Sequence, residues 1–468
     1  MKPSILAAFI LIIIMCIYSY LASLPVVGDA ALYSQTILEV ERTGKTTYLG
    51  YKETWKSPIF FYIYAFFDRF FNFLSFNPSL MVSFPCVLFF LISVFFFYKI
   101  SRLFFDEKFS AIATLVFSIN PISALIFSTP FNEAELMAFL LPSIYFYILA
   151  LRKDYFLIPA GILFAISFGI KTYEALIVPL LAIFYFIEQK ASKQKIFLLF
   201  SSFSFVVIPI FLNSFVFGIG EMFIYDLRHF FIGLENVASF IYDFFLLLFP
   251  FSIFSFFGFL KEESTRFFNF WFIFVFGVLI VDKGMPWYYS PVLPAIAVLT
   301  TKFFRKENKL DYLIILLILI FVVAYSFYMV KEIKTKANSI AYYSGEEEIK
   351  AAKILANKSK VLLLYYSPTF VYYYSFYSKY PLSVYWKIFL SNYTTEELKE
   401  AFSFKGENIT SWNKWFYGEI KAIYTNPIQN ISFVVLRDID YSKNSEFFSK
   451  QGYYPYIIFS RILILKKY

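Results

Sequence analysis

Residues suited to chemistry gather in the short polar segments between the long apolar stretches of this chain. Asp29 directly follows the first apolar run and is the first acidic residue, and Lys56 closes the same polar segment, Gly28–Pro58. Lys171 ends a later apolar run. A carboxylate at the mouth of a membrane helix is costly unless it faces water or a partner. Because a carboxylate can take an acceptor's proton and fixed cations can hold a phosphate leaving group, these residues predict transfer from a lipid-linked phosphate donor, with Asp29 as the base.

Further candidates stand in later polar segments of the same kind. Glu133 and Glu135 lie at the head of an apolar run, and both are candidates for a second acid. Asp29 and Glu133 are also the candidates for a divalent cation, a cofactor that two acids alone do not establish. The remaining candidates are Arg228, Lys283 and Tyr288 for the donor phosphate, and Glu53 and His229 for the acceptor.

Each candidate also has a purely structural explanation. Asp29 can cap the helix that we expect over Ala30–Val40, although one carboxylate can serve both purposes. Lys56 and Lys171 can be interfacial lysines whose ammonium groups reach water, and Tyr288 can belong to an aromatic belt.

The composition indicates a polytopic membrane protein. The chain has 468 residues, of which 59% are hydrophobic and 24% aromatic, and this is too apolar for a soluble protein of such length. The net charge of +9 falls between apolar runs, so it indicates basic loops on one membrane face rather than nucleic-acid binding. Cys16 and Cys86 both lie inside apolar runs, which leaves no disulfide framework and no cysteine metal site.

Apolar runs of spanning length predict about 11 to 13 transmembrane helices. The stretch Ile59–Phe76 is also apolar, but it carries Asp68 and Arg69, so we predict an amphipathic helix in the outer interface. The first run is predicted to be a retained span, because no clear signal-peptide cleavage site follows it. The spanning runs are Ile5–Leu24, Leu80–Ile100, Phe109–Phe127, Leu136–Leu151, Tyr155–Ile170, Ala175–Ile187, Ile196–Phe217, Phe240–Leu260, Phe267–Val281, Trp287–Phe303 and Tyr312–Val330.

The charges of the loops predict the orientation of the chain. With Ile59–Phe76 lying flat, every inside loop carries lysine or arginine, as the positive-inside rule requires. The N-terminus is then cytoplasmic, and the tail after residue 330 is outside a plasma membrane. The predicted inside loops are Ser101–Lys108, Arg152–Asp154, Glu188–Lys195, Lys261–Arg266 and Lys302–Lys309, and the outside loops are Gly28–Pro58, Ser128–Glu135, Lys171–Glu174, Gly218–Ser239 and Asp282–Pro286.

The tail differs in composition from the rest of the chain. We divide the sequence into a membrane domain at 1–330, whose first outer loop is 25–78, and a small extracytoplasmic α/β domain at 331–468. All four glycosylation sequons, at Asn357, Asn392, Asn408 and Asn430, lie in this tail. Helices are expected at Glu346–Asn357 and Thr394–Phe402, and strands at Val361–Tyr366, Ile431–Leu436 and Tyr456–Leu465.

The polar segments resemble those of a known family. GDAALYSQTILE followed by WKSPIFFYIYAFF is similar to the first outer loop of GT-C glycosyltransferases, in the branch of protein O-mannosyltransferases and lipid A aminoarabinose transferases. Asp29 takes the acidic position of that loop, Lys56 the basic one and Pro58 the second proline. The later segments that resemble the family place Glu133 on the acid of the second outer loop, Lys171 on a lysine turn and Tyr288 on a late tyrosine.

The resemblance implies a GT-C-like helical fold with juxtamembrane helices in the first outer loop. It implies inverting transfer of a sugar from a polyprenyl (dolichyl) phosphate donor to a protein, glycan or lipid acceptor at the outer face. Ser57 and Trp55 depart from the family pattern, and a Trp-Trp-Asp motif of oligosaccharyltransferases is absent from the sequence. The alternatives are a lipid-linked sugar transporter or flippase and a non-catalytic membrane scaffold. Abundant Ile, Lys and Tyr are typical of an archaeal protein.

Overall fold

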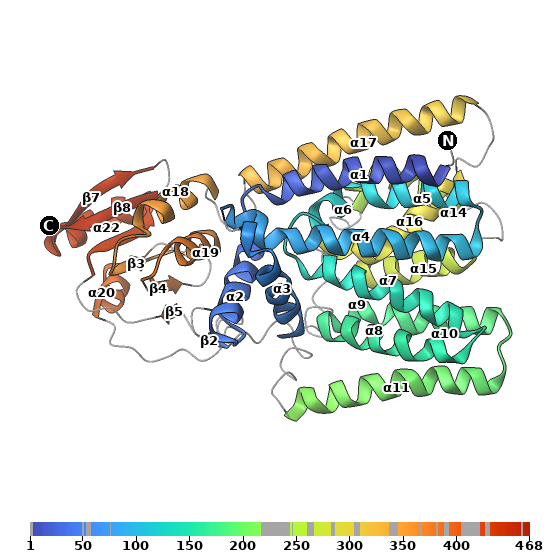
Figure 1. Cartoon of the computed structure of the whole chain (residues 1–468). Coiled ribbons are helices and arrows are strands. Elements are labelled where there is room, and N and C mark those ends of the chain that lie inside the picture. The colour runs from blue at the N-terminus through green and yellow to red at the C-terminus, as the bar shows by residue number, and fades with distance from the viewer. Residues whose placement is uncertain are drawn as a thin grey trace. The chain divides into compact units, whose positions relative to one another are not determined.

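The chain folds into two compact units in a computed structural model (Figure 1). Unit 1 comprises Met1–Ser23 and Ser83–Lys331, and unit 2 comprises Leu24–Val82 and Glu332–Tyr468. The structure describes residues 3–48, 51–52, 58–74, 76–216, 244–245, 247–259, 266–281, 286–303, 309–336, 345–365, 367–380, 382–387, 393–403, 422–425, 431–459 and 462–468.

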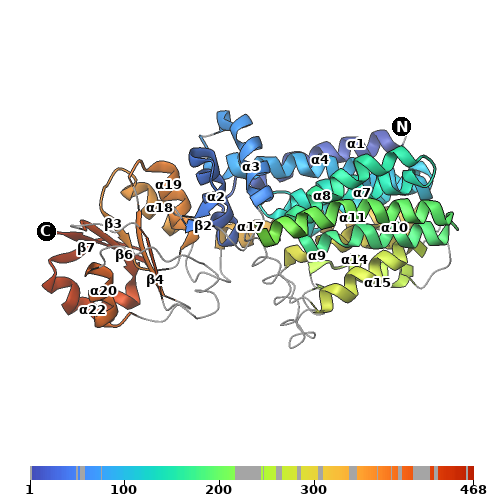
Figure 2. The same ribbon diagram turned by 90° about the horizontal axis from the view of Figure 1, so that it is seen from below.

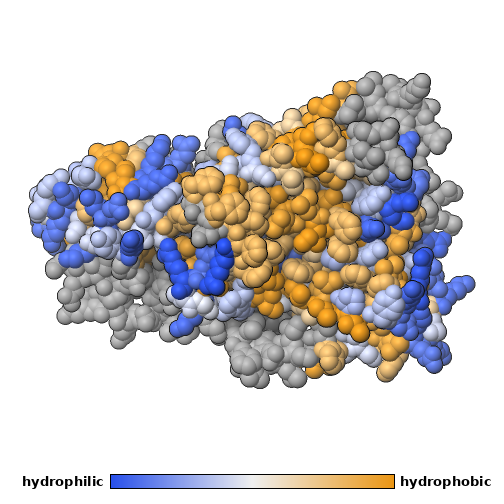
Figure 3. All heavy atoms as spheres, in the orientation of Figure 1, coloured by the Kyte–Doolittle hydropathy of each residue, from blue (hydrophilic) through white to orange (hydrophobic). Residues whose placement is uncertain are grey.

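Unit 1 is built from apolar helices. Among the described helices, α4 and α7 are each long and apolar enough to cross a membrane, and four shorter apolar segments lie in α1, η2–α8, α10 and α15. Hydrophobic side chains, orange in Figure 3, cover the visible side of these helices. The helices are α1 (Pro3–Ala22), α4 (Pro78–Phe104), α5 (Glu107–Ile119), α6 (Pro121–Ile126), α7 (Asn132–Ala150), η2 (Asp154–Phe156), α8 (Leu157–Ile170), α9 (Thr172–Ala175), α10 (Ile177–Glu188), α11 (Lys193–Val216), α14 (Phe251–Phe259), α15 (Arg266–Val281), η5 (Pro286–Val292), α16 (Leu293–Phe303) and α17 (Lys309–Lys336).

A proline separates α5 from α6. Pro121 has no backbone N–H to continue α5, and Asn120 starts the next helix by accepting a hydrogen bond from the Ser123 amide at 2.8 Å. The Asn120 side chain also donates to the Phe117 carbonyl at 2.8 Å, which satisfies a carbonyl at the break. The short α6 then leads to the segment that starts α7.

The helices of unit 1 alternate in direction, so their connections gather at two ends. At one end, Lys195 forms an ion pair with Asp154 at 3.3 Å, which joins the α7–α8 and α10–α11 connections. At the same end, the Phe104 ring packs 5.1 Å from that of Phe267 and 5.9 Å from that of Tyr185. Both views show α8 beside α11 (Figure 1, Figure 2). The predicted basic loops that the structure describes therefore share one end, and the starts of α7 and α9 lie at the other.

Unit 2 combines the first polar segment with the C-terminal tail. Its six-stranded sheet has the order β5-β4-β3-β6-β8-β7, in which β3 runs parallel to β4 and β6 and the other pairs are antiparallel. The tail elements are α18 (Gly345–Leu355), β3 (Val361–Leu363), α19 (Pro368–Tyr377), β4 (Leu382–Lys387), α20 (Thr395–Ser403), β5 (Ala422–Thr425), β6 (Phe433–Arg437), α22 (Asp438–Lys450), β7 (Tyr453–Ile458) and β8 (Ile462–Lys467). The elements of the first outer loop, 25–78, are α2 (Asp29–Thr43), β1 (Thr47–Tyr48), β2 (Tyr51–Lys52), α3 (Pro58–Phe70) and η1 (Asn72–Leu74).

The expected fold class is confirmed, with one correction in the tail. Tyr456–Leu465 was expected as one strand, but it belongs to the hairpin β7–β8, which the Phe459 amide closes with the Ile462 carbonyl at 2.9 Å. The polar pair Ser460-Arg461 interrupts the apolar run at this point. A run of β-branched and aromatic residues alone did not separate two short strands from one long strand.

Tyrosines of α19 bind both ends of the first outer loop, 25–78, within unit 2. The Tyr373 hydroxyl accepts a hydrogen bond from the Val26 amide at 3.0 Å and lies 2.6 Å from the Ser79 hydroxyl. The neighbouring Tyr372 hydroxyl donates to the Pro78 carbonyl at 2.8 Å. These rings are buried, so the aromatic run of α19 forms part of the core of unit 2.

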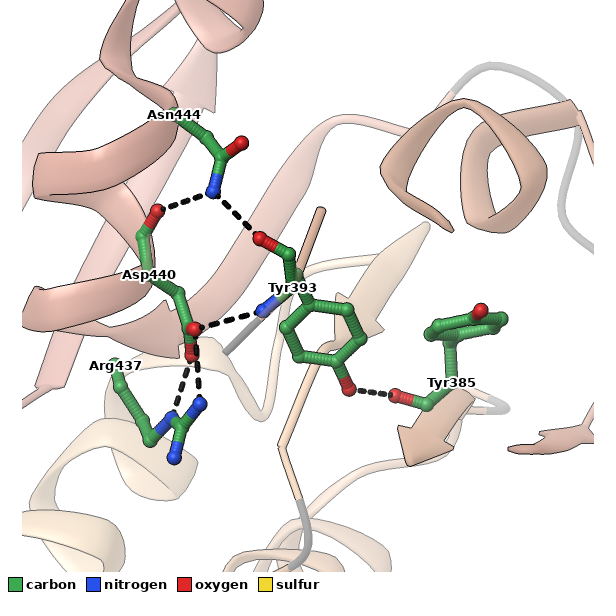
Figure 4. A network of polar contacts seen from close by, with 5 residues as sticks. All are labelled: Tyr385, Tyr393, Arg437, Asp440 and Asn444. Carbon is green, nitrogen blue, oxygen red and sulfur yellow. Dashed lines mark hydrogen bonds and ion pairs between the residues drawn. The ribbon is translucent and has the colours of Figure 1, made fainter. Parts of the chain in front are cut away.

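A satisfied buried ion pair lies inside the tail domain (Figure 4). Arg437 binds both carboxylate oxygens of Asp440, and the Tyr393 amide donates to the same carboxylate at 3.2 Å. Asn444 donates to the Tyr393 carbonyl, and the Tyr393 hydroxyl donates to the Tyr385 carbonyl. Every group in this network meets a protein partner, so it fixes α22 against the sheet and is not a candidate site.

Candidate functional site

The described candidates of unit 1 converge on the ammonium of Lys171. Lys171 ends α8 in an extended backbone conformation and is only 4% exposed. Its ammonium donates to Glu133 at 2.8 Å and to Glu174, and it lies 3.7 Å from the centroid of the Tyr288 ring. Two buried carboxylates and one aromatic ring therefore surround a single lysine.

Glu133 is held firmly by its position on α7. It lies in the first turn of a 19-residue helix, where a negative charge is favoured by the helix dipole. In the orientation that satisfies its hydrogen bonds, the Asn132 amide donates to both Glu133 oxygens, at 3.0 and 2.9 Å. The Glu133 side chain is fully buried.

Glu174 is held differently. It stands on α9, a four-residue helix between the end of α8 and the start of α10, three residues after Lys171. The Glu174 residue is 6% exposed. Sequence reasoning placed Glu174 in the outer loop Lys171–Glu174 but gave it no role. The only signal was its i,i+3 spacing from the lysine, and this spacing brings side chains together once the turn is helical.

The site is rich in negative charge for its degree of burial. Glu135 is also fully buried, and neither of its carboxylate oxygens has a hydrogen-bond partner among the described residues. At the Lys171 site, Glu133 and Glu174 thus share the one described cation, Lys171. Because burying unbalanced charge is costly, a further anion fits beside Lys171 only if one of these carboxylates is displaced or protonated. Within the described ranges, no three histidine, cysteine or acidic side chains are placed to hold a metal ion.

Asp29 opens α2 in unit 2. Gly28, not Asp29, occupies the N-cap position and has a φ of 57°, a left-handed conformation that favours glycine. The half-buried Asp29 is the first helical residue, where its carboxylate suits the helix dipole. The N-cap explanation for Asp29 is therefore wrong, and its catalytic role stays a prediction.

The structure brings together three of the predicted site residues: Glu133, Lys171 and Tyr288. Asp29 belongs to unit 2, and each unit is described by itself. The other candidates, Lys56, Glu53, Arg228, His229 and Lys283, lie outside the residues whose side chains the structure describes.

Comparison with known proteins places this geometry in a family context. Residues 55–212 match the family model described as dolichyl-phosphate-mannose-protein mannosyltransferase. The crystal structure of ArnT from Cupriavidus metallidurans bound to undecaprenyl phosphate superposes with a TM-score of 0.71 at 13% identity, covering 98% of this chain and 97% of that one. The chain has the GT-C glycosyltransferase fold. The expected GT-C-like fold is thus confirmed, and the family match at residues 55–212 agrees with the resemblance seen in the sequence.

Other GT-C structures are more distant. The apo form of the same ArnT gives a TM-score of 0.67 at 11% identity. The Archaeoglobus fulgidus oligosaccharyltransferase gives 0.50 at 11% identity, covering 91% of this chain and 69% of that one. No curated protein sequence matches the chain. The GT-C fold of this chain therefore rests on structural likeness along nearly its whole length and on the family match at 55–212.

Proposed function

We propose that this GT-C protein transfers a sugar from a polyprenyl-phosphate donor to an acceptor at the extracytoplasmic face of the membrane. The observation that carries the proposal is the buried Lys171 ammonium, which lies at the end of unit 1 opposite the basic loops. A buried ammonium at a membrane surface suits the phosphate of a lipid-linked sugar. The family description names a dolichyl-phosphate-mannose donor, and the ArnT structure holds undecaprenyl phosphate, which supports this donor class.

Each proposed residue has a defined part in the reaction. Lys171 binds the leaving phosphate, together with Lys56, Arg228 and Lys283, and Tyr288 orders the Lys171 ammonium. The acceptor oxygen attacks the anomeric carbon, the bond from that carbon to the phosphate oxygen breaks, and polyprenyl phosphate leaves with the electron pair. Asp29 takes the acceptor proton. Because the acceptor attacks in a single displacement from the face opposite the leaving phosphate, the anomeric configuration is inverted.

The remaining candidate residues concern the acceptor and a divalent ion. Glu53, Glu133 and His229 are the proposed contacts to the acceptor, which is a protein, a glycan or another lipid. Mannose, the sugar in the family description, is the first candidate to test. A divalent ion is included in the assay as a variable, with Asp29 and Glu133 as its proposed ligands.

The proposed orientation puts the N-terminus in the cytoplasm and the tail outside a plasma membrane. The composition of the chain favours the plasma membrane of an archaeon. The gathering of basic loops at one end of unit 1 supports this orientation. An exposed apolar stripe on α3 supports a position in the outer interface. One face of this helix is buried in the protein, and the opposite face exposes apolar, mostly aromatic side chains. The exposed side chains of the stripe are Ile59, Tyr62, Phe66 and Phe70, continued by Phe73 and Phe76.

A transfer assay tests the proposal. Purified full-length protein in liposomes receives a radiolabelled polyprenyl-phosphate mannose, together with extracted membranes as the acceptor source, with and without a divalent metal ion. Label that moves from the lipid to a new product, with release of polyprenyl phosphate, is the expected outcome. Movement of intact donor across the bilayer without cleavage would instead identify a flippase. If the label neither moves to a product nor crosses the bilayer, the scaffold alternative is supported.

A further inference from the structure

The Lys171 ammonium is bound by two carboxylates of the protein itself. Glu133 and Glu174 both accept hydrogen bonds from it, and the Tyr288 ring covers another side. An ammonium has only three hydrogens to donate. A lipid phosphate that reaches Lys171 must therefore share the ammonium or replace one of the two carboxylates.

The two carboxylates differ in how easily they can leave. Glu133 is fixed by two hydrogen bonds from Asn132 on the long helix α7. Glu174 stands on the four-residue α9, beyond a break at Lys171 where the backbone is extended at φ −151° and ψ 102°. A short helical turn between two longer helices can move with fewer lost contacts than the interior of a long helix. The geometry therefore singles out Glu174 as the anion that yields.

We propose that Glu174 is an internal counter-anion that occupies the phosphate place on Lys171 until the donor arrives and returns to it when polyprenyl phosphate leaves. This role rests on the proposed function of the site. The ligand that Glu174 competes with is the phosphate group of a polyprenyl phosphate. Glu174 acts through Lys171, so it is a positioning residue and not a catalytic one.

The role has a specific kinetic signature. Removing the Glu174 charge removes a competitor and a repulsive neighbour of the phosphate, so both donor and product bind more tightly. Tighter product binding slows its release, so kcat falls while KM for the donor falls as well. A residue that only stabilised the fold would lower activity without tightening the binding of polyprenyl phosphate.

The test measures binding of polyprenyl phosphate to the purified full-length protein. We expect Glu174→Gln to bind it about tenfold more tightly than wild type, because the like charge beside the anion is gone. Lys171→Ala should bind it weakly, and in the double variant the gain from Glu174→Gln should disappear. Glu188→Gln, at the far end of α10, is the matched control for loss of one carboxylate and should bind like wild type.

The outcomes separate this inference from the proposed function. Unchanged or weaker binding by Glu174→Gln, with binding lost in Lys171→Ala, would overturn the counter-anion role and leave the phosphate site standing. Unchanged binding in both variants would overturn the phosphate site itself. Should Glu174→Gln fail to fold, Glu174→Ala removes the same charge, so a gain in affinity is again expected and its absence again decisive.

Discussion

The Lys171 ammonium lies 3.7 Å from the centroid of the Tyr288 ring. The ring belongs to η5, in which the next residue, Tyr289, is fully buried. The Trp271 indole N–H also donates to the Pro291 carbonyl of η5 at 2.8 Å. The negative face of an aromatic ring attracts a cation most strongly where water is excluded. Tyr288 therefore keeps the ammonium in place whichever anion it binds.

This relationship predicts different effects for two substitutions of Tyr288. Tyr288→Phe keeps the ring face and should change polyprenyl-phosphate affinity by less than about threefold, whereas Tyr288→Leu should weaken it about tenfold, the loss expected for a partly desolvated cation–π contact. The measurement is the dissociation constant of polyprenyl phosphate for each purified variant. An equal loss in both variants would transfer the role from the ring face to the hydroxyl.

Replacing Lys171 should also destabilise the fold. In Lys171→Met, two carboxylates remain buried without their cation, and breaking a buried pair in this way costs about 3–5 kcal/mol. The control is Lys195→Met, which removes a partly exposed pair with Asp154 and should cost no more than about 1 kcal/mol. Thermal unfolding in detergent measures both, and adding Glu133→Gln to Lys171→Met should restore part of the loss. Equal melting temperatures for the two single variants would contradict the buried charge balance.

The sequence allowed part of this site to be predicted. Alternation of basic and non-basic loops put Glu133, Lys171 and Tyr288 at one end of the helices, and the structure brings these three together. Glu174 was not predicted, because its contact depends on a helix break directly after Lys171. Nothing in the local residue pattern specifies the direction of such a break.

Long-range packing was also beyond the sequence pattern. The aromatic run of α19 stands out only by its composition, and neither period nor composition identifies the residues it packs against. Its hydrogen bonds to Val26 and Pro78 join segments that lie roughly three hundred residues apart in the chain. By contrast, the amphipathic helix at Ile59–Phe76 was predicted from its own charges and apolar positions, and α3 with η1 occupies this stretch.

The proposed topology can be tested by single-cysteine labelling. Cys16 and Cys86 are first replaced, and one cysteine is then placed at Ser192 or at Lys443, both of which are exposed. A membrane-impermeant maleimide added to intact cells should label position 443 at once and position 192 only after permeabilisation. The positive-inside rule gives the reason, because Ser192 lies in a basic loop. The reverse pattern would invert the whole orientation.

Unit 2 should be more stable at acidic than at alkaline pH. Burial raises the pKa of Glu348 to about 7, although hydrogen bonds from Ser367 and Thr369 act to lower it. Burial likewise raises the pKa of Glu41 to about 7, against the opposing charges of Arg69 and Arg42. Because these folded-state values lie above the unfolded value near 4.5, the stabilisation is complete below about pH 4.5 and is lost as the pH rises through 7.

Hydrogen exchange of the full-length protein measures this pH dependence. After correction for intrinsic exchange rates, peptides from residues 345–377 should lose protection between pH 5 and pH 8, by on the order of 1–2 kcal/mol. Glu348→Gln should flatten this dependence, because the amide stays neutral at both values of pH. Glu446→Gln removes a carboxylate from the exposed surface of α22 and should leave the dependence intact. A flat profile in the wild type would contradict the raised pKa of Glu348.

The decisive prediction concerns Asp29. An acceptor hydroxyl is a poor nucleophile until its proton is taken or shared, and a carboxylate within reach typically contributes about 10²–10⁴-fold to the rate. Since Gly28 holds the N-cap position of α2, replacing Asp29 by the nearly isosteric asparagine should leave the start of the helix intact. Asp29→Asn should therefore fold, bind polyprenyl phosphate normally and lose turnover by about that factor.

A matched substitution separates catalysis from the helix-dipole role of Asp29. Glu107 occupies the same kind of position in the first turn of α5, at the end of unit 1 that carries the basic loops. Glu107→Gln should cost no more than about 1 kcal/mol of stability and leave turnover near that of wild type. Transfer rates are measured with saturating donor and acceptor, so that a change in binding does not mimic a loss of the base. Near-normal transfer by a well-folded Asp29→Asn protein would return this carboxylate to a purely structural role at the start of α2.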